Sequence, residues 1–351
     1  MKKIVFLLFI LLGFFACEET NDYLPPEFNY EIPATTINQN VIVGAVYYNY
    51  AAADWAKKYT NVPELGEYSP LTASIMQQHR KWADTGGIDF FIFPWNGTSG
   101  NALLTSFTTD RAENVKMVIN YSTAHLSATN ASPLTGTKLN NMVNEFKTFA
   151  TTHFNKDYYL KIDSKPVVII NPLNLSSSAL TSIDFPTVIA TLRQELKNAG
   201  TELFLIGEVT SGWLPPQRYK TATLAFDAIS LTNWIPSGNY GYDRAVFYPA
   251  FSDQAFKNWN DSTSLWNVSF VPCIMPGFND KTMTPASKNF NIDRSEKLFT
   301  DMCNVAKRNM GSKRIVFIQS WNHFQLGTSV EPAKEYGVKY LNISKAELKV
   351  P

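Results

Sequence analysis

The chain has 351 residues, and its 31 basic side chains almost balance its 30 acidic ones. This balance excludes the strongly basic surface that nucleic acids and anionic membranes select. Aromatic residues make up 14% of the chain, with eight Trp and sixteen Tyr; such a content is typical of a large apolar core and also of proteins that stack rings on sugars.

Residues 1–17, MKKIVFLLFILLGFFAC, have the pattern of a secretory signal of the lipoprotein type. Lys2 and Lys3 precede an apolar stretch, and Ala16 precedes Cys17. We therefore expect a signal peptide that ends at Cys17, with a lipid on this cysteine as an anchor in the membrane. An uncleaved membrane anchor is the alternative, but the apolar stretch is short for a span.

Residues 18–40 are rich in Pro, Asn and Thr and cannot bury a core, so they predict a flexible tether. The acidic residues Glu18, Glu19 and Asp22 resemble the export signal that sends lipoproteins to the cell surface in Bacteroidetes; a merely polar tether is the alternative. We expect an outer-membrane, lipid-anchored protein that faces the cell surface or the periplasm.

The remaining residues, 41–351, suffice for one large domain. Short runs that are continuously apolar recur along it, as in strands of a parallel sheet covered on both faces. There are eight such runs, at 41–48, 88–95, 115–121, 167–171, 203–208, 227–233, 268–274 and 314–321.

Helical patterns lie between these runs. Ser69-Pro70 predicts a helix start and Gly86-Gly87 its end, and similar patterns fit residues 138–154, 185–199 and 293–310. Eight such units predict an α/β fold, a single (β/α)8 TIM-type barrel. An open doubly wound sheet is the alternative, but no GxGxxG follows any strand run.

In such a barrel the chemistry lies at the carboxyl ends of the strands. Amide and indole groups there orient sugar hydroxyls, and aromatic faces stack on sugar rings. Each residue alone has a structural alternative, because strand-end Asn often caps the next helix. The strand ends predict a carbohydrate site that contains Tyr47, Tyr48, Trp95, Asn96, Tyr121, Glu208, Trp234, Trp321, Asn322 and His323.

Cysteines and histidines indicate neither a disulfide framework nor a metal. Cys273 and Cys303 lie in apolar runs, and two buried thiols are favoured over a disulfide in a domain of this size. The four histidines show no HExxH or paired spacing, so we expect no metal and no cofactor.

Three groups of segments match motifs of one known family, and they occur in the same order as in that family. They are VGAVYYNY, ELGEYSP and QQHRKWADTGGIDFFIFPWNG within residues 43–97; VPCIMPGFND with IDR within 271–294; and IQSWNHFQLGTSVEP with YGVKYL within 318–341. With them the chain resembles glycoside hydrolase family 99, the endo-α-mannosidases and endo-α-mannanases, and the related WbsX-like domains. The resemblance implies a barrel that acts on or binds carbohydrate.

The resemblance also locates the family's two catalytic glutamates, and both are missing. Their positions hold His323 and Leu326. Leucine carries no proton, and one histidine does not replace a pair, because glycoside cleavage needs both a proton donor and a group that assists attack.

Other carboxyl groups are weaker candidates. Glu208 ends the run LFLIGE and is a candidate acid, although a buried ion pair or a contact with a sugar hydroxyl is favoured over catalysis. His323 is the other candidate for catalysis. Asp280 matches a family aspartate that orients loop groups or sugar hydroxyls, with Asn279 in place of its acidic neighbour. Glu331 matches a glutamate that we interpret as structural.

Three hypotheses follow. The first is a surface lipoprotein whose family 99-like cleft binds a polysaccharide or oligosaccharide such as α-mannan, beside partner proteins of a polysaccharide uptake system. The second is an active, endo-acting glycoside hydrolase that uses other acids such as Glu208. The third is a scaffold without sugar affinity, which leaves the aromatic residues at the strand ends unexplained.

Overall fold

The computed structural model describes residues 28, 30–171, 182–209, 215, 220–231 and 247–350. Its strands form one sheet in the order β8-β7-β6-β5-β3-β2-β1-β10-β9, in which every pair of neighbours is parallel, and β4 pairs antiparallel with β5. The strands are β1 (Ile42–Val46), β2 (Phe90–Trp95), β3 (Lys116–Ser122), β4 (Lys161–Ile162), β5 (Lys165–Asn171), β6 (Phe204–Val209), β7 (Ala228–Leu231), β8 (Ser269–Val271), β9 (Cys273–Ile274) and β10 (Ile315–Ile318).

The sheet closes into a barrel at the junction of β8 and β9. Only Pro272 separates these two short strands; β7 pairs with β8, and β10 pairs with β9. The Phe317 N–H donates to the Pro272 carbonyl across 2.9 Å, so hydrogen bonding to β10 continues through the proline. Because β8 and β9 share one position, the described strands occupy the eight positions of a (β/α)8 barrel, and all eight predicted strands are confirmed.

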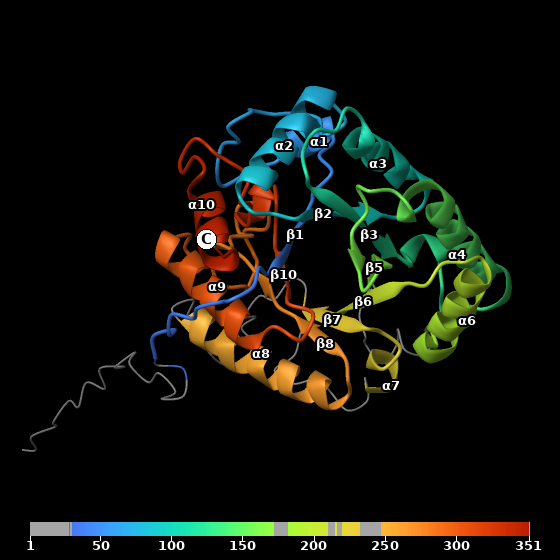
Figure 1. Cartoon of the computed structure of the whole chain (residues 1–351). Coiled ribbons are helices and arrows are strands. Elements are labelled where there is room, and N and C mark those ends of the chain that lie inside the picture. The colour runs from blue at the N-terminus through green and yellow to red at the C-terminus, as the bar shows by residue number, and fades with distance from the viewer. Residues whose placement is uncertain are drawn as a thin grey trace, which may run out of the picture.

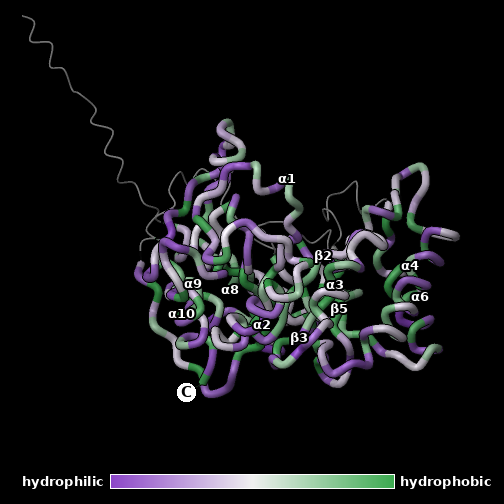
Figure 2. Tube along the Cα trace, turned by 90° about the horizontal axis from the view of Figure 1, so that it is seen from above, coloured by the Kyte–Doolittle hydropathy of each residue, from purple (hydrophilic) through white to green (hydrophobic). Residues whose placement is uncertain are grey.

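Helices surround the barrel on its outer side (Figure 1). In Figure 2 the tubes of helices such as α4 and α6 change between purple and green, as expected for helices with one face on the sheet and one in solvent. Among the described residues the helices are α1 (Ala52–Trp55), α2 (Ala73–Thr85), α3 (Asn101–Thr108), α4 (Gly136–Phe149), α6 (Phe185–Asn198), α7 (Lys220–Thr223), α8 (Tyr248–Leu265), α9 (Glu296–Asn309) and α10 (Lys339–Leu348).

The four predicted helices are α2, α4, α6 and α9, but the predicted start of α2 is wrong. The helix begins at Ala73 with Thr72 as its N-cap residue. Ser69 and Pro70 instead open a turn, in which the Thr72 N–H donates to the Ser69 carbonyl across 3.0 Å. Proline fits the second position of such a turn as well as it fits the first turn of a helix, so the dipeptide is ambiguous.

Side chains of the strands separate into two buried clusters on opposite faces of the sheet, since successive residues of a strand point to opposite sides. The larger cluster lies between the strands and the helices. The smaller cluster fills the barrel interior with residues taken from alternate positions of the strands: Phe90, Ile92, Val118, Val167, Ile169, Phe204, Ile206, Ala228, Val271, Cys273, Ile315 and Phe317.

The segment from residue 30 to 40, predicted as part of a flexible tether, instead packs on the barrel. Tyr30 donates its hydroxyl to Asp253 of α8 at 2.8 Å, and the Thr35 N–H donates to Asn304 of α9 at 2.7 Å. Aromatic and aliphatic side chains of the segment hold it in place. The average composition of the segment is polar and does not indicate this packing. Residues 1–27, which include Cys17, lie outside the described residues.

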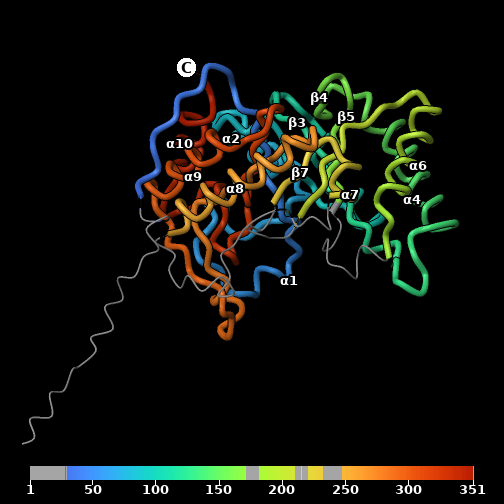
Figure 3. The backbone as a smooth tube through the Cα atoms, turned by 90° about the horizontal axis from the view of Figure 1, so that it is seen from below, coloured from blue at the N-terminus to red at the C-terminus, as the bar shows by residue number. Residues whose placement is uncertain are grey.

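The end of this segment meets the C-terminal end of the chain (Figure 3). The Val41 N–H donates to the Leu348 carbonyl at 3.0 Å, and the Val350 N–H donates to the Asn40 side chain at 2.7 Å. In the part of the chain that the structure describes, no helix combines the length and apolar character that a membrane crossing requires.

One glycine is required by the packing of the barrel interior. A Cβ atom on Gly44 of β1 would lie 2.2 Å from the Phe90 ring of β2. The absent side chain therefore makes room for a phenylalanine at the barrel axis.

We predict that Gly44→Ala destabilises the fold by about 1–3 kcal/mol, because the added methyl group overpacks the interior. Urea denaturation measures the loss. Adding Phe90→Leu should recover part of it, since the smaller side chain frees the space; a double variant no more stable than Gly44→Ala contradicts this explanation.

Candidate functional site

The register of the strands decides which side chains reach the barrel axis at the carboxyl ends. Asn120, Glu208 and Ser230 each stand two residues after an interior apolar residue of β3, β6 and β7. They therefore form a polar layer on top of the apolar interior. Asn120 Nδ2 donates to Glu208 Oε1 across 3.2 Å although β5 lies between their strands, so the two side chains meet inside the barrel.

Several predicted sugar-binding aromatics have the opposite register and lie beneath the helices. Tyr47, Trp95 and Tyr121 are at most 2% exposed. Tyr47 packs on Phe93 with ring centroids 5.0 Å apart, and Trp95 stacks on Tyr121 at 5.3 Å. These rings offer no face to a sugar in this structure and act in the core; the two-residue alternation within each run is the pattern that distinguishes them.

Two further predicted residues on the last loop are also fully buried. Trp321 lies 4.9 Å from the Phe91 ring, and its Nε1 has no hydrogen-bond partner. Asn322 uses its amide group within the protein. Both support the loop from below rather than present a surface to a ligand.

Tyr48 and His323 form the exposed part of this region. Both side chains are half-buried, and their rings stack with centroids 4.4 Å apart and an angle of 9° between planes. Leu326, also half-buried, ends the short 3₁₀ helix η8 (Phe324–Leu326) that follows His323. The two positions at which the sequence resemblance places the family's glutamates thus hold a stacked imidazole and an aliphatic side chain.

Burial keeps His323 uncharged at neutral pH. It lowers the pKa of the imidazole to about 4; Asp54 opposes this shift and Lys57 adds to it. Within the described residues the ring nitrogens have no hydrogen-bond partner. A neutral imidazole with this pKa is a poor proton donor at pH 7.

A buried chain of hydrogen bonds holds the last loop against β1. Asn322 accepts from the Tyr48 N–H at 2.7 Å and donates to the Tyr48 carbonyl at 3.0 Å, and its Nδ2 also donates to the Tyr68 hydroxyl at 3.1 Å. Tyr68 donates to Glu331 Oε2 at 2.5 Å. The backbone of Tyr48, and hence its stack on His323, is thereby tied to a carboxyl group beneath the loop.

The other oxygen of Glu331 continues the chain back to β1. His79 Nε2 lies 3.1 Å from Glu331 Oε1, and the Tyr47 hydroxyl lies 2.8 Å from His79 Nδ1. All groups are satisfied if Tyr47 donates to Nδ1 and the Nε2–H donates to Glu331. Because His79 and Glu331 are both 0% exposed, Glu331 is a structural residue, in agreement with our interpretation of the sequence.

The other predicted residues have separate places. Asn96 is exposed, and its Oδ1 accepts from the His125 N–H at 3.1 Å. Asp280 accepts from Ser287 at 2.6 Å and from Asn289 at 2.7 Å, so it organises its own loop. Trp234 lies outside the described residues.

The cysteines of the described chain, Cys273 and Cys303, are free and buried, which confirms the prediction of two thiols. Burial raises the pKa of the Cys303 thiol. No cluster of three or more His, Cys, Asp or Glu side chains suitable for a metal ion occurs among the residues that the structure describes.

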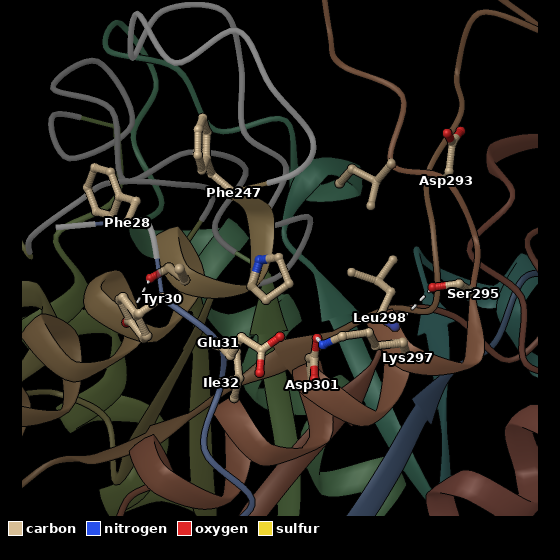
Figure 4. A pocket seen from close by; sticks show the side chains of 13 residues that line it. Phe28, Tyr30, Glu31, Ile32, Phe247, Asp293, Ser295, Lys297, Leu298 and Asp301 are labelled. Atoms are coloured by element: carbon tan, nitrogen blue, oxygen red, sulfur yellow. Dashed lines mark hydrogen bonds and ion pairs between the residues drawn. The ribbon is translucent and has the colours of Figure 1, made fainter. Parts of the chain in front are cut away.

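A cavity of about 600 Å³ lies elsewhere, between the N-terminal residues 28 and 30–32 and the helices α8 and α9 (Figure 4). Lys297 and Asp301 on α9 form an ion pair of 2.8 Å in its wall. None of the predicted site residues lines it. The cavity results from the packing of the N-terminal segment on the barrel and is not part of the strand-end site.

Comparison with a known family model settles the family. The model described as "Glycosyltransferase WbsX" matches residues 57–344. The chain belongs to the WbsX family. No curated protein matched the chain.

Solved structures with the same fold agree with this assignment. A "Glycoside hydrolase-like protein" has 26% identity and a TM-score of 0.82, covering 92% of this chain and 98% of its own. A family 99 endo-α-mannosidase from Bacteroides thetaiotaomicron, solved with bis-tris-propane, has 18% identity and a TM-score of 0.63, covering 89% and 96%. A second structure described as the endo-α-mannosidase from this organism has 17% identity and a TM-score of 0.61, covering 88% and 96%.

These findings confirm the resemblance to family 99 and WbsX-like domains and the TIM-type barrel. This WbsX-family domain is glycoside hydrolase-like, and its family and fold both relate it to carbohydrate.

We predict a pH dependence of stability from His323. Its pKa is about 4 in the folded chain and about 6.5 when unfolded, so the unfolded chain binds the proton more tightly. The contribution, up to about 3 kcal/mol, is complete above pH 6.5 and is lost as the pH falls towards 4. Urea denaturation between pH 4 and 7 should show a smaller slope for His323→Gln than for the wild type; equal slopes contradict the assignment.

We also predict that Glu331→Gln destabilises the fold by about 1–3 kcal/mol, since the amide nitrogen replaces an acceptor that Tyr68 or His79 needs. Urea denaturation measures the change. The control is Glu64→Gln at an exposed position, and a loss equal to the control's would show that the buried chain does not support the loop.

Proposed function

We propose that this protein binds a polysaccharide or oligosaccharide at the mouth of its barrel and does not cleave it by the usual pair of carboxyl groups. The observation that carries the proposal is the neutral stack of Tyr48 and His323, with Leu326 beside it, at the positions of the family's catalytic acids. Hydrolysis by two carboxyl groups needs a proton donor and a base or nucleophile, and neither side chain serves that pair of roles at neutral pH.

The same three side chains favour binding. A sugar ring presents C–H groups on its faces and hydroxyls at its edge, so an aromatic and aliphatic surface takes the face while polar groups take the edge. The unpaired nitrogens of His323 supply one donor and one acceptor in the neutral imidazole. Endo-α-mannosidases of the same fold make an α-mannan the first ligand to test.

The place of action is part of the proposal. The lipoprotein signal, with Cys17 as its lipidated residue, supports an outer-membrane protein that faces the cell surface or the periplasm. There the barrel would hold glycan beside partner proteins of a polysaccharide uptake system. The acidic residues after Cys17 favour the outward orientation.

Glu208 supports a second candidate function, hydrolysis by an altered mechanism. It is a carboxyl group inside the mouth, in contact with Asn120. In an endo-acting hydrolase it would serve as acid or base toward the glycosidic oxygen or a water. Product analysis distinguishes the two candidates: cleavage by the wild type that Glu208→Gln abolishes establishes the second.

For the first candidate we predict that His323→Ala weakens glycan binding roughly 3- to 30-fold, because it removes the stack and one hydrogen bond. Affinity electrophoresis in gels with α-mannan and a panel of microbial polysaccharides measures the shift. His153→Ala is the control, since this histidine is also half-buried but follows α4 and contacts Tyr158.

The expected result is a shift for the wild type and for His153→Ala, and a weaker shift for His323→Ala. No retardation of the wild type by any polysaccharide in the panel overturns the binding function. Equal shifts of all three proteins would place the binding surface away from His323. Trp321→Ala is not a useful test, because the side chain is buried in the core.

A further inference from the structure

Two buried polar atoms in the layer above the barrel interior have no partner. They are Asn120 Oδ1 on β3 and Ser230 Oγ on β7. A buried acceptor or hydroxyl without a partner costs roughly 1–3 kcal/mol, so natural proteins retain few of them. Unpaired groups at a functional position are therefore candidates for hydrogen bonds to a ligand.

Both atoms belong to one cluster around Glu208. Glu208 and Ser230 are direct partners in the register of β6 and β7, and Asn120 donates its amide to Glu208 from the other side. Below the cluster the barrel is closed by apolar side chains, among them Val118 and Ile206. The cluster is a polar floor at the carboxyl ends of the strands.

We propose that Asn120, Glu208 and Ser230 form the floor of a subsite for the hydroxyl edge of one neutral sugar ring. This inference rests on the proposed glycan binding. Asn120 Oδ1 accepts from one hydroxyl, and Ser230 Oγ exchanges a hydrogen bond with a neighbouring one. Asn120 is half-buried, whereas Ser230 is fully buried.

The composition of the floor selects the class of sugar. Its unpaired atoms are one acceptor and one hydroxyl, which match the hydroxyls of a neutral sugar. The carboxyl group of Glu208, 4% exposed, supplies no positive charge that would attract a uronate or a sulfate.

The test compares two serines that are both 0% exposed and both carry an unpaired Oγ: Ser230 in the floor and Ser344 on the outer helix α10. Ser230→Ala should weaken the binding of α-mannan oligosaccharides roughly 3- to 10-fold in titration calorimetry, by the loss of one hydrogen bond. Ser344→Ala should leave the affinity unchanged. The melting temperature of the free protein should not fall in either variant, since each removes an unpaired polar atom.

A second arm titrates the wild type with oligogalacturonides as the anionic probe. Neutral binding stronger than anionic binding, together with the loss in Ser230→Ala alone, supports the subsite. Equal affinity of Ser230→Ala and wild type for the neutral oligosaccharides overturns the subsite but leaves the proposed glycan binding intact. Stronger binding of the anionic probe than of the neutral one also overturns the subsite. A lower melting temperature of Ser230→Ala with unchanged affinity assigns the serine to a buried water instead. Absence of binding by the wild type to either probe and to the polysaccharide panel overturns the proposed function itself.

Discussion

The alternation of side chains along closed parallel strands is the constraint on which this structure depends. Once β8 and β9 join β7 to β10, every strand residue belongs either to the barrel interior or to the layer beneath the helices. On β6 the residues that face the interior are apolar up to Ile206, and the next residue on that face, Glu208, is polar. A shift by a single residue would exchange the two faces, so the register determines both the core and the site.

The last loop is held in place by contacts made outside positions 323 and 326. A chain of hydrogen bonds links the loop to β1. It starts at the Tyr48 backbone and ends at the Tyr47 hydroxyl, and it runs through Asn322, Tyr68, Glu331 and His79. None of these contacts involves His323 or Leu326. The hydrogen bonds that hold the loop therefore do not depend on the side chains at positions 323 and 326.

Much of the fold could be predicted from the sequence because buried parallel strands have a clear sequence pattern. Runs such as VVIIN are continuously apolar, and Gly86-Gly87 marks a helix end. The start of α2 could not be predicted, since Ser69-Pro70 fits a turn and a helix equally. The anchoring of residues 30–40 was also missed, because Tyr30 binds Asp253 across more than two hundred positions and a local composition carries no trace of that contact.

The candidate site was predicted less well, for a related reason. Every aromatic or polar residue at a strand end was treated as a candidate for the site. Tyr47 and Tyr48 were therefore both included, although they face opposite sides of the sheet. Only contacts show which of them is free: Tyr47 bonds to His79 in the core, whereas Tyr48 stacks on His323 at the mouth. Ser230 was overlooked because a serine within an apolar strand has no motif, and its meaning depends on Glu208 beside it.

We propose that the exchange of the family's two acids for His323 and Leu326 also changes the energetics of ligand binding. Two carboxyl groups at a mouth repel each other and must be desolvated when a sugar covers them, which opposes binding unless the transition state recovers the cost. A neutral imidazole stacked on Tyr48 and an aliphatic neighbour carry no such cost, and the apolar area that they offer favours the face of a sugar. Under the proposed function, a mouth with this composition would stabilise bound glycan in its ground state, as a glycan-binding protein requires.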